Sequence, residues 1–252
     1  MDETVSICLA VLASFAVSMG LFAAAPKILS RLSTQYRLLG PQKRALTDHE
    51  FKSVLVNIVL GSVGVYVFLF DPEVYPRRVR YNCLLLRHGV AGYLGYTIAD
   101  AFLLVRYRLH DTNVFLIHHV VGTLCGLAGT IYTSVPWIMS TFLYYEASNP
   151  FVHFRAILSA LGMKKTRLYI VNGLMMIAVF FLCRVAIIPV YWRTVYLLYI
   201  DGSFPQIDTF VYYLMIYGRL FFDVLNVYWF SLMMRAAFAI FVWPKLDAKI
   251  QD

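Results

Sequence analysis

Long uncharged stretches are the feature that most constrains how this chain can fold. Seven apolar runs can be drawn along its 252 residues, and a helix of roughly 20 apolar residues is long enough to cross the hydrocarbon core of a bilayer. To within a few residues, these runs are 5–25, 53–70, 84–105, 114–133, 137–153, 169–191 and 209–232. The seventh run can extend to Trp243. The sequence therefore predicts an all-α polytopic membrane protein with seven transmembrane helices.

Composition agrees with this class. Hydrophobic residues make up 60% of the chain and charged residues only 14%, which is more apolar than a soluble domain of this length. The net charge of +8 comes mainly from the connections between runs, a pattern typical of topology-setting charges rather than of nucleic-acid binding. The four cysteines show no metal-ligand spacing and are expected to be small apolar side chains.

The distribution of Lys and Arg predicts the sidedness. With the N-terminus outside, most of them fall on one face, which the positive-inside rule places in the cytosol. The other face collects Arg77, Arg78, Arg80, Arg87 and Arg193. We therefore expect a lumenal N-terminus and a cytosolic C-terminus, although the cluster at 77–80 leaves an even number of spans as an alternative.

A basic stretch from Pro26 to Lys52 separates the first run from the others. We expect residues 1–49 to form an N-terminal transmembrane helix and a basic cytosolic linker. Residues 50–242 would form a six-helix unit, and 243–252 a short cytosolic tail. The acidic start of the chain, with Asp2 and Glu3, argues against a cleaved signal peptide.

Several polar side chains lie at a similar depth in the predicted cytosolic half. Ionisable groups in hydrocarbon cost free energy, so they usually face a bundle interior or a wet cavity. Asp100 lies about 7 Å from the cytosolic end of the third run, at a helical rise of about 1.5 Å per residue. The others at this depth are His118, His119, Glu146, Asp223 and Asn226. These groups predict one polar cavity shared by four helices.

Neutral imidazole in such a site can act as a general base or nucleophile, with a carboxylate fixing its tautomer. Asp100, Glu146 and Asp223 are all candidates for that carboxylate. Adjacent helical residues point about 100° apart, so one histidine can do chemistry while the other orients a helix or binds a carboxylate. A tolerated polar pair near the interface is the simpler alternative. Two His and two carboxylates could also hold a divalent ion, but the usual i,i+3 or i,i+4 spacing is missing, and we predict no metal site.

Two arginines lie inside the runs. Arg219 and Asp223 have i,i+4 spacing, so an intrahelical ion pair is as well supported as a site role. Arg184 has no partner on its own run, and it could pair with an acid elsewhere or bind an anionic headgroup. We take Arg184, Arg219, Asp223 and Asn226 as candidate lipid-binding residues. Asn149-Pro150 predicts a kink in the fifth run.

An ordered set of motifs resembles a known family. The motifs are Tyr66-Val67-Phe68-Leu69-Phe70-Asp71, Gly95-Tyr96-x-x-x-Asp100, His118-His119, Glu146-x-Ser148-x-Pro150-Phe151, Asn172-Gly173-x-x-Met176-x-x-Val179-Phe180-Phe181-x-x-Arg184 and Asp223-x-x-Asn226-x-x-Trp229. Over about residues 50–242 the chain resembles the TLC domain shared by ceramide synthases, translocating-chain-associating membrane proteins and orphan TLC-domain-containing proteins. The greatest similarity is to the orphan branch that includes TLC-domain-containing protein 4.

This resemblance implies a first helix followed by a six-helix barrel around a lipid-accommodating cavity, usually in the endoplasmic reticulum. In ceramide synthases the paired histidines belong to a centre that moves a fatty acyl group from coenzyme A to a sphingoid amine. By this resemblance the catalytic candidates are His118, His119 and Glu146, and Asp100 could substitute spatially for a missing acid. Ceramide synthases carry a His-Asp and a further Asp before that Glu, whereas this chain has Ile138-Met139-Ser140-Thr141-Phe142.

Three functions therefore stay open. The first is binding or processing of lipid acyl chains, with an influence on sphingolipid and phospholipid homeostasis. The second is a ceramide-synthase-like N-acyltransferase with acyl-coenzyme A as co-substrate, and the third is a cargo or trafficking role in the endoplasmic reticulum. The expected partners are membrane lipids, such as ceramide or fatty acyl chains, and no nucleic acid. No other cofactor is expected.

Overall fold

The computed structural model describes residues 2–109 and 112–241, and every named element in this part of the chain is a helix. This confirms the predicted all-α class. The α-helices are α1 (Glu3–Leu32), α2 (Thr34–Arg37), α3 (Pro41–Phe70), α4 (Leu84–Tyr107), α5 (Thr112–Ile131), α6 (Pro136–Glu146), α7 (Asn149–Ala160), α8 (Arg167–Phe180), α9 (Ile187–Ile200), α10 (Thr209–Tyr213) and α11 (Arg219–Phe241). Two π-helical segments, Phe181–Val185 and Leu214–Gly218, join α8 to α9 and α10 to α11.

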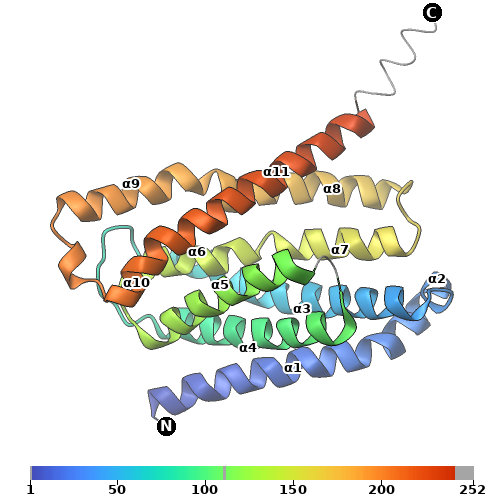
Figure 1. The fold of residues 1–252 in the computed structure, drawn as a ribbon, viewed down its shortest axis with the longest axis horizontal. Coiled ribbons are helices and arrows are strands. Elements are labelled where there is room, and N and C mark those ends of the chain that lie inside the picture. Colours follow the sequence, from blue (N-terminus) through green and yellow to red (C-terminus); the bar gives the residue numbers. More distant parts are fainter. Residues whose placement is uncertain (1, 110–111, 242–252) are drawn as a thin grey trace, which may run out of the picture.

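The long helices lie side by side, with α1 at one edge of the bundle and α11 running obliquely across it (Figure 1). The first helix packs against α3 and α4. In turn, α3 packs against α6 and α7, and α4 packs against α5. The buried polar side chains of α3 and α4, such as Lys52 and Asp100, therefore lie between helices.

Four helical segments in the described part are long and apolar enough to cross a membrane, and Leu116–Ile131 is a shorter apolar helix. The four are Glu3–Leu32, Pro41–Phe70, Arg167–Ile200 and Thr209–Ala239. The protein is thus a multi-pass membrane protein. Seven crossings and the orientation of the ends stay predictions, as does the extension of the last helix to Trp243, which lies outside the described residues.

The expected basic linker is largely helical. The first helix continues through Pro26 to Leu32, and α3 begins at Pro41 rather than near residue 53. Proline suits the first turn of a helix, where its missing N–H has no intrahelical partner. From Thr47 onward, polar residues of α3 are buried against other helices, including His49 and Lys52. A hydropathy profile ends an apolar run at such residues. The helix itself continues through them, because other helices supply partners for their polar groups.

The kink predicted at Asn149-Pro150 is present as a break between α6 and α7. The sixth helix ends at Glu146 and the seventh begins at Asn149. The carbonyl of Tyr145 at this break accepts a hydrogen bond of 3.1 Å from Nη2 of Arg184. The amide and the Oγ of Ser148 donate to the same carbonyl over 3.2 and 2.9 Å, so the backbone at the break keeps hydrogen-bond partners.

The arginines at 77–80 and Arg87 lie beside carboxylates. Arg77 Nε donates to Asp201 Oδ2 over 2.8 Å, and Arg80 Nη1 donates to Asp208 Oδ2 over 3.1 Å. The other two pairs are Arg78 with Glu73 and Arg87 with Glu3. The cluster that weakened the sidedness prediction is therefore compensated by local ion pairs.

Candidate functional site

A cavity of about 330 Å³ lies inside the bundle. Apolar and aromatic groups such as Leu104, Phe180 and Trp229 form part of its wall. Five residues singled out in the sequence also line it, namely Asp100, His118, His119, Glu146 and Arg184. Three others, Arg219, Asp223 and Asn226, are not among the lining residues.

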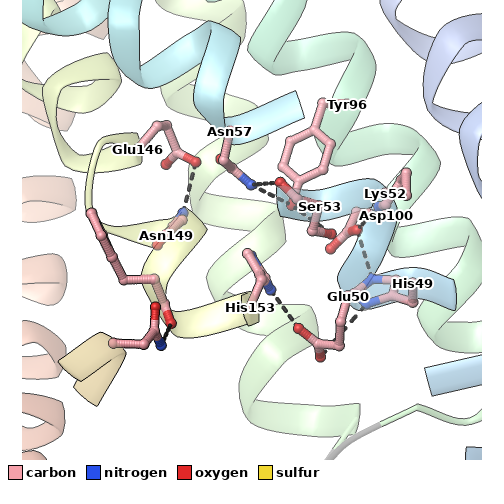
Figure 2. Close-up of polar contacts among 12 residues, drawn as sticks. His49, Glu50, Lys52, Ser53, Asn57, Tyr96, Asp100, Glu146, Asn149 and His153 are labelled. Carbon is pink, nitrogen blue, oxygen red and sulfur yellow. Dashed lines mark hydrogen bonds and ion pairs between the residues drawn. The ribbon is translucent and has the colours of Figure 1, made fainter. Parts of the chain in front are cut away.

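Asp100 on α4 is the centre of the polar cluster. Its Oδ2 lies 2.9 Å from Nε2 of His119, and its Oδ1 lies 2.7 Å from Nε2 of His49. Lys52 Nζ also donates to Oδ1, and its ammonium lies 4.6 Å from the centroid of the Tyr96 ring. Figure 2 shows Lys52 and His49 of α3 turned toward Asp100. Because a buried charge is tolerated only when it is paired, these partners allow a carboxylate at this depth.

Beyond His49, the cluster continues as alternating imidazoles and carboxylates. His49 Nδ1 lies 4.0 Å from Glu50 Oε1, and Glu50 Oε2 lies 2.6 Å from Nδ1 of His153 on α7 (Figure 2). Both His119 and His153 line the cavity. Imidazole and carboxylate groups both serve as proton donors and acceptors in proteins, and the series sets such groups between two points of the cavity wall, with one separation of 4.0 Å.

The two adjacent histidines have different surroundings. His119 is held by Asp100 through Nε2, which leaves Nδ1 as the lone-pair nitrogen when Nε2 carries the proton. The ring of His118 instead meets Phe222 and Trp229 edge-on, at centroid distances of 5.2 and 5.4 Å. Neither Nδ1 has a hydrogen-bond partner in the described part of the chain. His119 is therefore the imidazole that a carboxylate orients, and His118 contributes an aromatic wall with a polar edge.

Glu146 and Arg184 lie at the break between α6 and α7. Asn149 Nδ2 donates to Glu146 Oε2 over 2.8 Å. The guanidinium of Arg184 donates to Ser148 Oγ over 2.8 Å and to Asn149 Oδ1 over 2.7 Å. Its Nη1 donates to Asn226 Oδ1 over 3.2 Å, so Asn226 supports the site through Arg184.

Among the described residues, no acid lies within ion-pair distance of Arg184. Of the two alternatives for Arg184, pairing with an acid elsewhere is not found among the described residues. Hydrogen bonds to neutral groups hold the guanidinium instead. Binding of an anionic headgroup by Arg184 stays a prediction. Arg184 also lies in the π-helix Phe181–Val185, and π-bulges are frequent at functional sites.

Arg219 and Asp223 form the predicted intrahelical ion pair. Arg219 Nε donates to Asp223 Oδ1 over 2.6 Å, and Trp192 Nε1 donates to Asp223 Oδ2 over 2.8 Å. The guanidinium lies 4.0 Å from the centroid of the Tyr191 ring. The arginine side chain is fully buried, so this pair cross-links helices away from the cavity wall.

Sequence reasoning missed four contributors to the cluster, His49, Glu50, Lys52 and His153. The first three fall in the basic stretch that separates the first two runs, and the fourth lies at the edge of the fifth run. Continuing the helix back from residue 53 to Pro41 would have placed His49 and Lys52 on a membrane-spanning segment. His153 follows Glu146 by seven residues, about two helical turns, which is the spacing of one helix face.

In the described part of the chain, no group of three or more His, Cys, Asp or Glu side chains is arranged to hold a metal ion. The ammonium of Lys52 already compensates the carboxylate at the centre of the cluster. The expectation of no metal stays a prediction.

Together, the helical fold and the buried histidine–carboxylate cavity define a multi-pass membrane protein with a polar site inside its bundle. The family model of the TLC domain matches residues 48–235. The chain therefore belongs to the TLC-domain family, as its motifs indicated.

Curated relatives of the same branch support this assignment. TLC domain-containing protein 4-A of Xenopus laevis is 26% identical over 98% of this chain and 96% of its own length. TLC domain-containing protein 4-B of Danio rerio is 27% identical over 90% of this chain and 86% of its own length. TLC domain-containing protein 4 of Homo sapiens is 24% identical over 79% and 77% of the two chains. The resemblance to this branch is confirmed.

Proposed function

We propose that this protein binds a lipid acyl chain in the histidine cavity and acts on the polar end of that chain. The cavity wall combines apolar groups with one cluster of ionisable side chains. Small-molecule sites commonly have this composition, since apolar walls hold the ligand and a few polar groups orient it. Membrane lipids are the most abundant ligands at this depth, so binding or processing of acyl chains is the proposed role in membrane lipid homeostasis.

One observation favours chemistry in addition to binding. Asp100 Oδ2 lies 2.9 Å from His119 Nε2, which is the arrangement of a carboxylate orienting a general base. The Nδ1 lone pair of His119 would take the proton of an amine or hydroxyl group as its nitrogen or oxygen attacks an acyl carbon. Asp100 would stabilise the imidazolium formed. The acyl carbon then releases its former carrier, which takes up the proton from His119.

The reaction proposed by resemblance is N-acyl transfer from acyl-coenzyme A, a co-substrate, to a sphingoid or other amine. Glu146 lines the same cavity and would attract a cationic amine before its deprotonation. The proposed location is the membrane of the endoplasmic reticulum, with a lumenal N-terminus and a cytosolic C-terminus. The charge distribution supports this orientation.

The experiment incubates purified protein with radiolabelled acyl-coenzyme A and a panel of amines and alcohols, and separates the acylated products. We expect product formation that His119→Gln abolishes. The matched control is His88→Gln, because His88 bonds Ser6 and is not a cavity-lining residue.

Equal loss in both variants, or full activity in His119→Gln, would overturn the general-base role. Mass spectrometry of lipid co-purified with the protein tests binding separately. A protein without bound lipid or turnover that still captures a trafficking partner would overturn the lipid function and support the trafficking alternative.

A further inference from the structure

A second cavity, of about 380 Å³, adjoins the first at Leu232 and Met233 of α11, which line both. It lies between α7, α8 and α11, and most of its lining is apolar, for example Ile170 and Leu174. Two cations also line it, Arg155 on α7 and Lys164 in the connection to α8. The cavity therefore combines mostly apolar walls with two cationic side chains.

Arg155 is held in a defined position. Its Nη1 donates to the carbonyl oxygen of Tyr169 over 3.1 Å, and its guanidinium carbon lies 3.9 Å from the centroid of the Tyr169 ring. A Cβ at Gly173 would lie only 2.2 Å from Nη1, so a glycine there gives the guanidinium its space. The one hydrogen bond within the described chain uses one of five N–H donors. The guanidinium of Arg155 is therefore fixed and half-buried, and its remaining N–H groups are available to bind an anion.

The protein itself supplies no counter-charge in its described part. No carboxylate there forms an ion pair with Arg155 or Lys164, and the cavity lining includes no Asp or Glu among the described residues. By contrast, the buried guanidinium of Arg219 has a counter-charge, the carboxylate of Asp223. Unpaired cations next to hydrocarbon favour a bound anion.

The surroundings identify the anion. Lys164 precedes Lys165 and Arg167, and this basic connection lies on the face that the charge distribution assigns to the cytosol. Anionic phospholipids gather at that leaflet and are attracted by basic groups, and Arg binds phosphate through two parallel N–H bonds. Apolar walls beside the cations match acyl chains.

We propose that the second cavity binds the phosphate headgroup of an anionic glycerophospholipid between Arg155 and Lys164. The acyl chain passes Leu232 and Met233 toward the histidine cavity. The headgroup site stands on its own contacts, whereas the course of the chain rests on the proposed function. The pair of cavities would then select lipid by headgroup charge and present its chain to the polar cluster.

The test compares binding of radiolabelled dioleoyl phosphatidic acid with that of dioleoylglycerol, which has the same chains and no phosphate. We expect the purified protein to bind the phosphatidic acid about tenfold more tightly, a modest difference for two phosphate contacts near a membrane surface. Arg155→Gln with Lys164→Gln should remove this preference and leave dioleoylglycerol binding unchanged.

Lys165→Gln with Arg167→Gln is the matched control, because both residues are exposed and neither is a cavity-lining residue. It removes the same charge and should keep the preference. Equal binding of the two lipids, or equal loss in both double variants, would overturn the site. Complete displacement by millimolar inorganic phosphate would also overturn it, because the site would then take free phosphate rather than a lipid.

A phosphatidic acid with a photoreactive group at the end of one chain separates the two proposals. Labelling of Trp229 or Leu104 supports the course of the chain into the histidine cavity. A headgroup preference without such labelling would refute that course and the acyl-chain part of the proposed function, while the phosphate site would stand.

Discussion

His119 Nε2 lies 2.9 Å from Asp100 Oδ2 across the contact between α5 and α4. The same carboxylate also meets His49 and Lys52 from α3. One acid thus joins three helices, and it orients the imidazole proposed to transfer a proton. Loss of this acid should affect stability and chemistry together, and the two effects can be separated.

Asp100→Asn should destabilise the protein because it leaves the fully buried ammonium of Lys52 without its counter-charge. Breaking one partner of a buried pair costs about 3–5 kcal/mol. Adding Lys52→Met should recover most of the loss, since the double variant has no unpaired charge. Thermal unfolding in detergent measures both, and a single variant as stable as the wild type would contradict the pairing.

Glu50→Gln should slow turnover without changing lipid binding. Glu50 connects His49 with His153, and an amide cannot accept and release a proton as a carboxylate does. General acid–base contributions are about 10²–10⁴-fold, and we expect a loss of about tenfold or more, because Glu50 acts through other residues. The pH–rate profile should change shape, unlike that of the exposed-loop control Glu73→Gln. An unchanged profile would remove Glu50 from the proton path.

Asp223→Asn should lower stability and leave the occupancy of the histidine cavity unchanged. The carboxylate compensates the buried Arg219 and accepts from Trp192, but neither Arg219 nor Asp223 is a cavity-lining residue. Thermal unfolding should show a loss of about 3 kcal/mol or more. Mass spectrometry of retained lipid should match the wild type, and a selective loss of lipid would instead assign Asp223 to the site.

Gly64→Ala should destabilise the contact between α3 and α6. A Cβ at this position would lie 2.3 Å from the carbonyl carbon of Leu143, and backbone cannot yield as a flexible side chain does. Overpacking of this kind costs about 1–3 kcal/mol. At Gly20 a Cβ meets nothing within 4 Å, so Gly20→Ala should be neutral or slightly stabilising. Similar effects at both positions would contradict the close helix contact.

The ion pair between Arg80 and Asp208 should make stability depend on acid. Burial raises the pKa of Asp208, but hydrogen bonds from Ser134 and Arg80 outweigh it and lower the pKa below its ordinary value. The stabilisation is therefore present above about pH 4, the pKa of an unfolded aspartate, and is lost as pH falls through the lowered folded pKa. Asp208→Asn should be less stable at pH 6 and should lose less stability on acidification. If the stabilities of the wild type and Asp208→Asn changed in parallel with pH, Asp208 would not be the source of the acid dependence.

The sequence alone determined the fold class, because long uncharged runs leave few structures other than membrane-spanning helices. It also predicted that His118, His119, Asp100 and Glu146 share a depth, since helical rise converts sequence position into height, and all four line the histidine cavity. The i,i+4 pair of Arg219 and Asp223 followed from local geometry.

Only the tertiary structure decided which partners meet. From predicted depth alone, Asp100, Glu146 and Asp223 were equally good candidates for the carboxylate beside the histidine. The packing and rotation of the helices place Asp100 next to His119. Hydropathy placed His49 and Lys52 in a linker. A hydropathy average gives each polar residue a fixed unfavourable value, as if its side chain had no partner in the protein. In the structure, partners on other helices compensate the free-energy cost of burying these polar groups. The local sequence around His49 and Lys52 does not indicate which helices supply those partners.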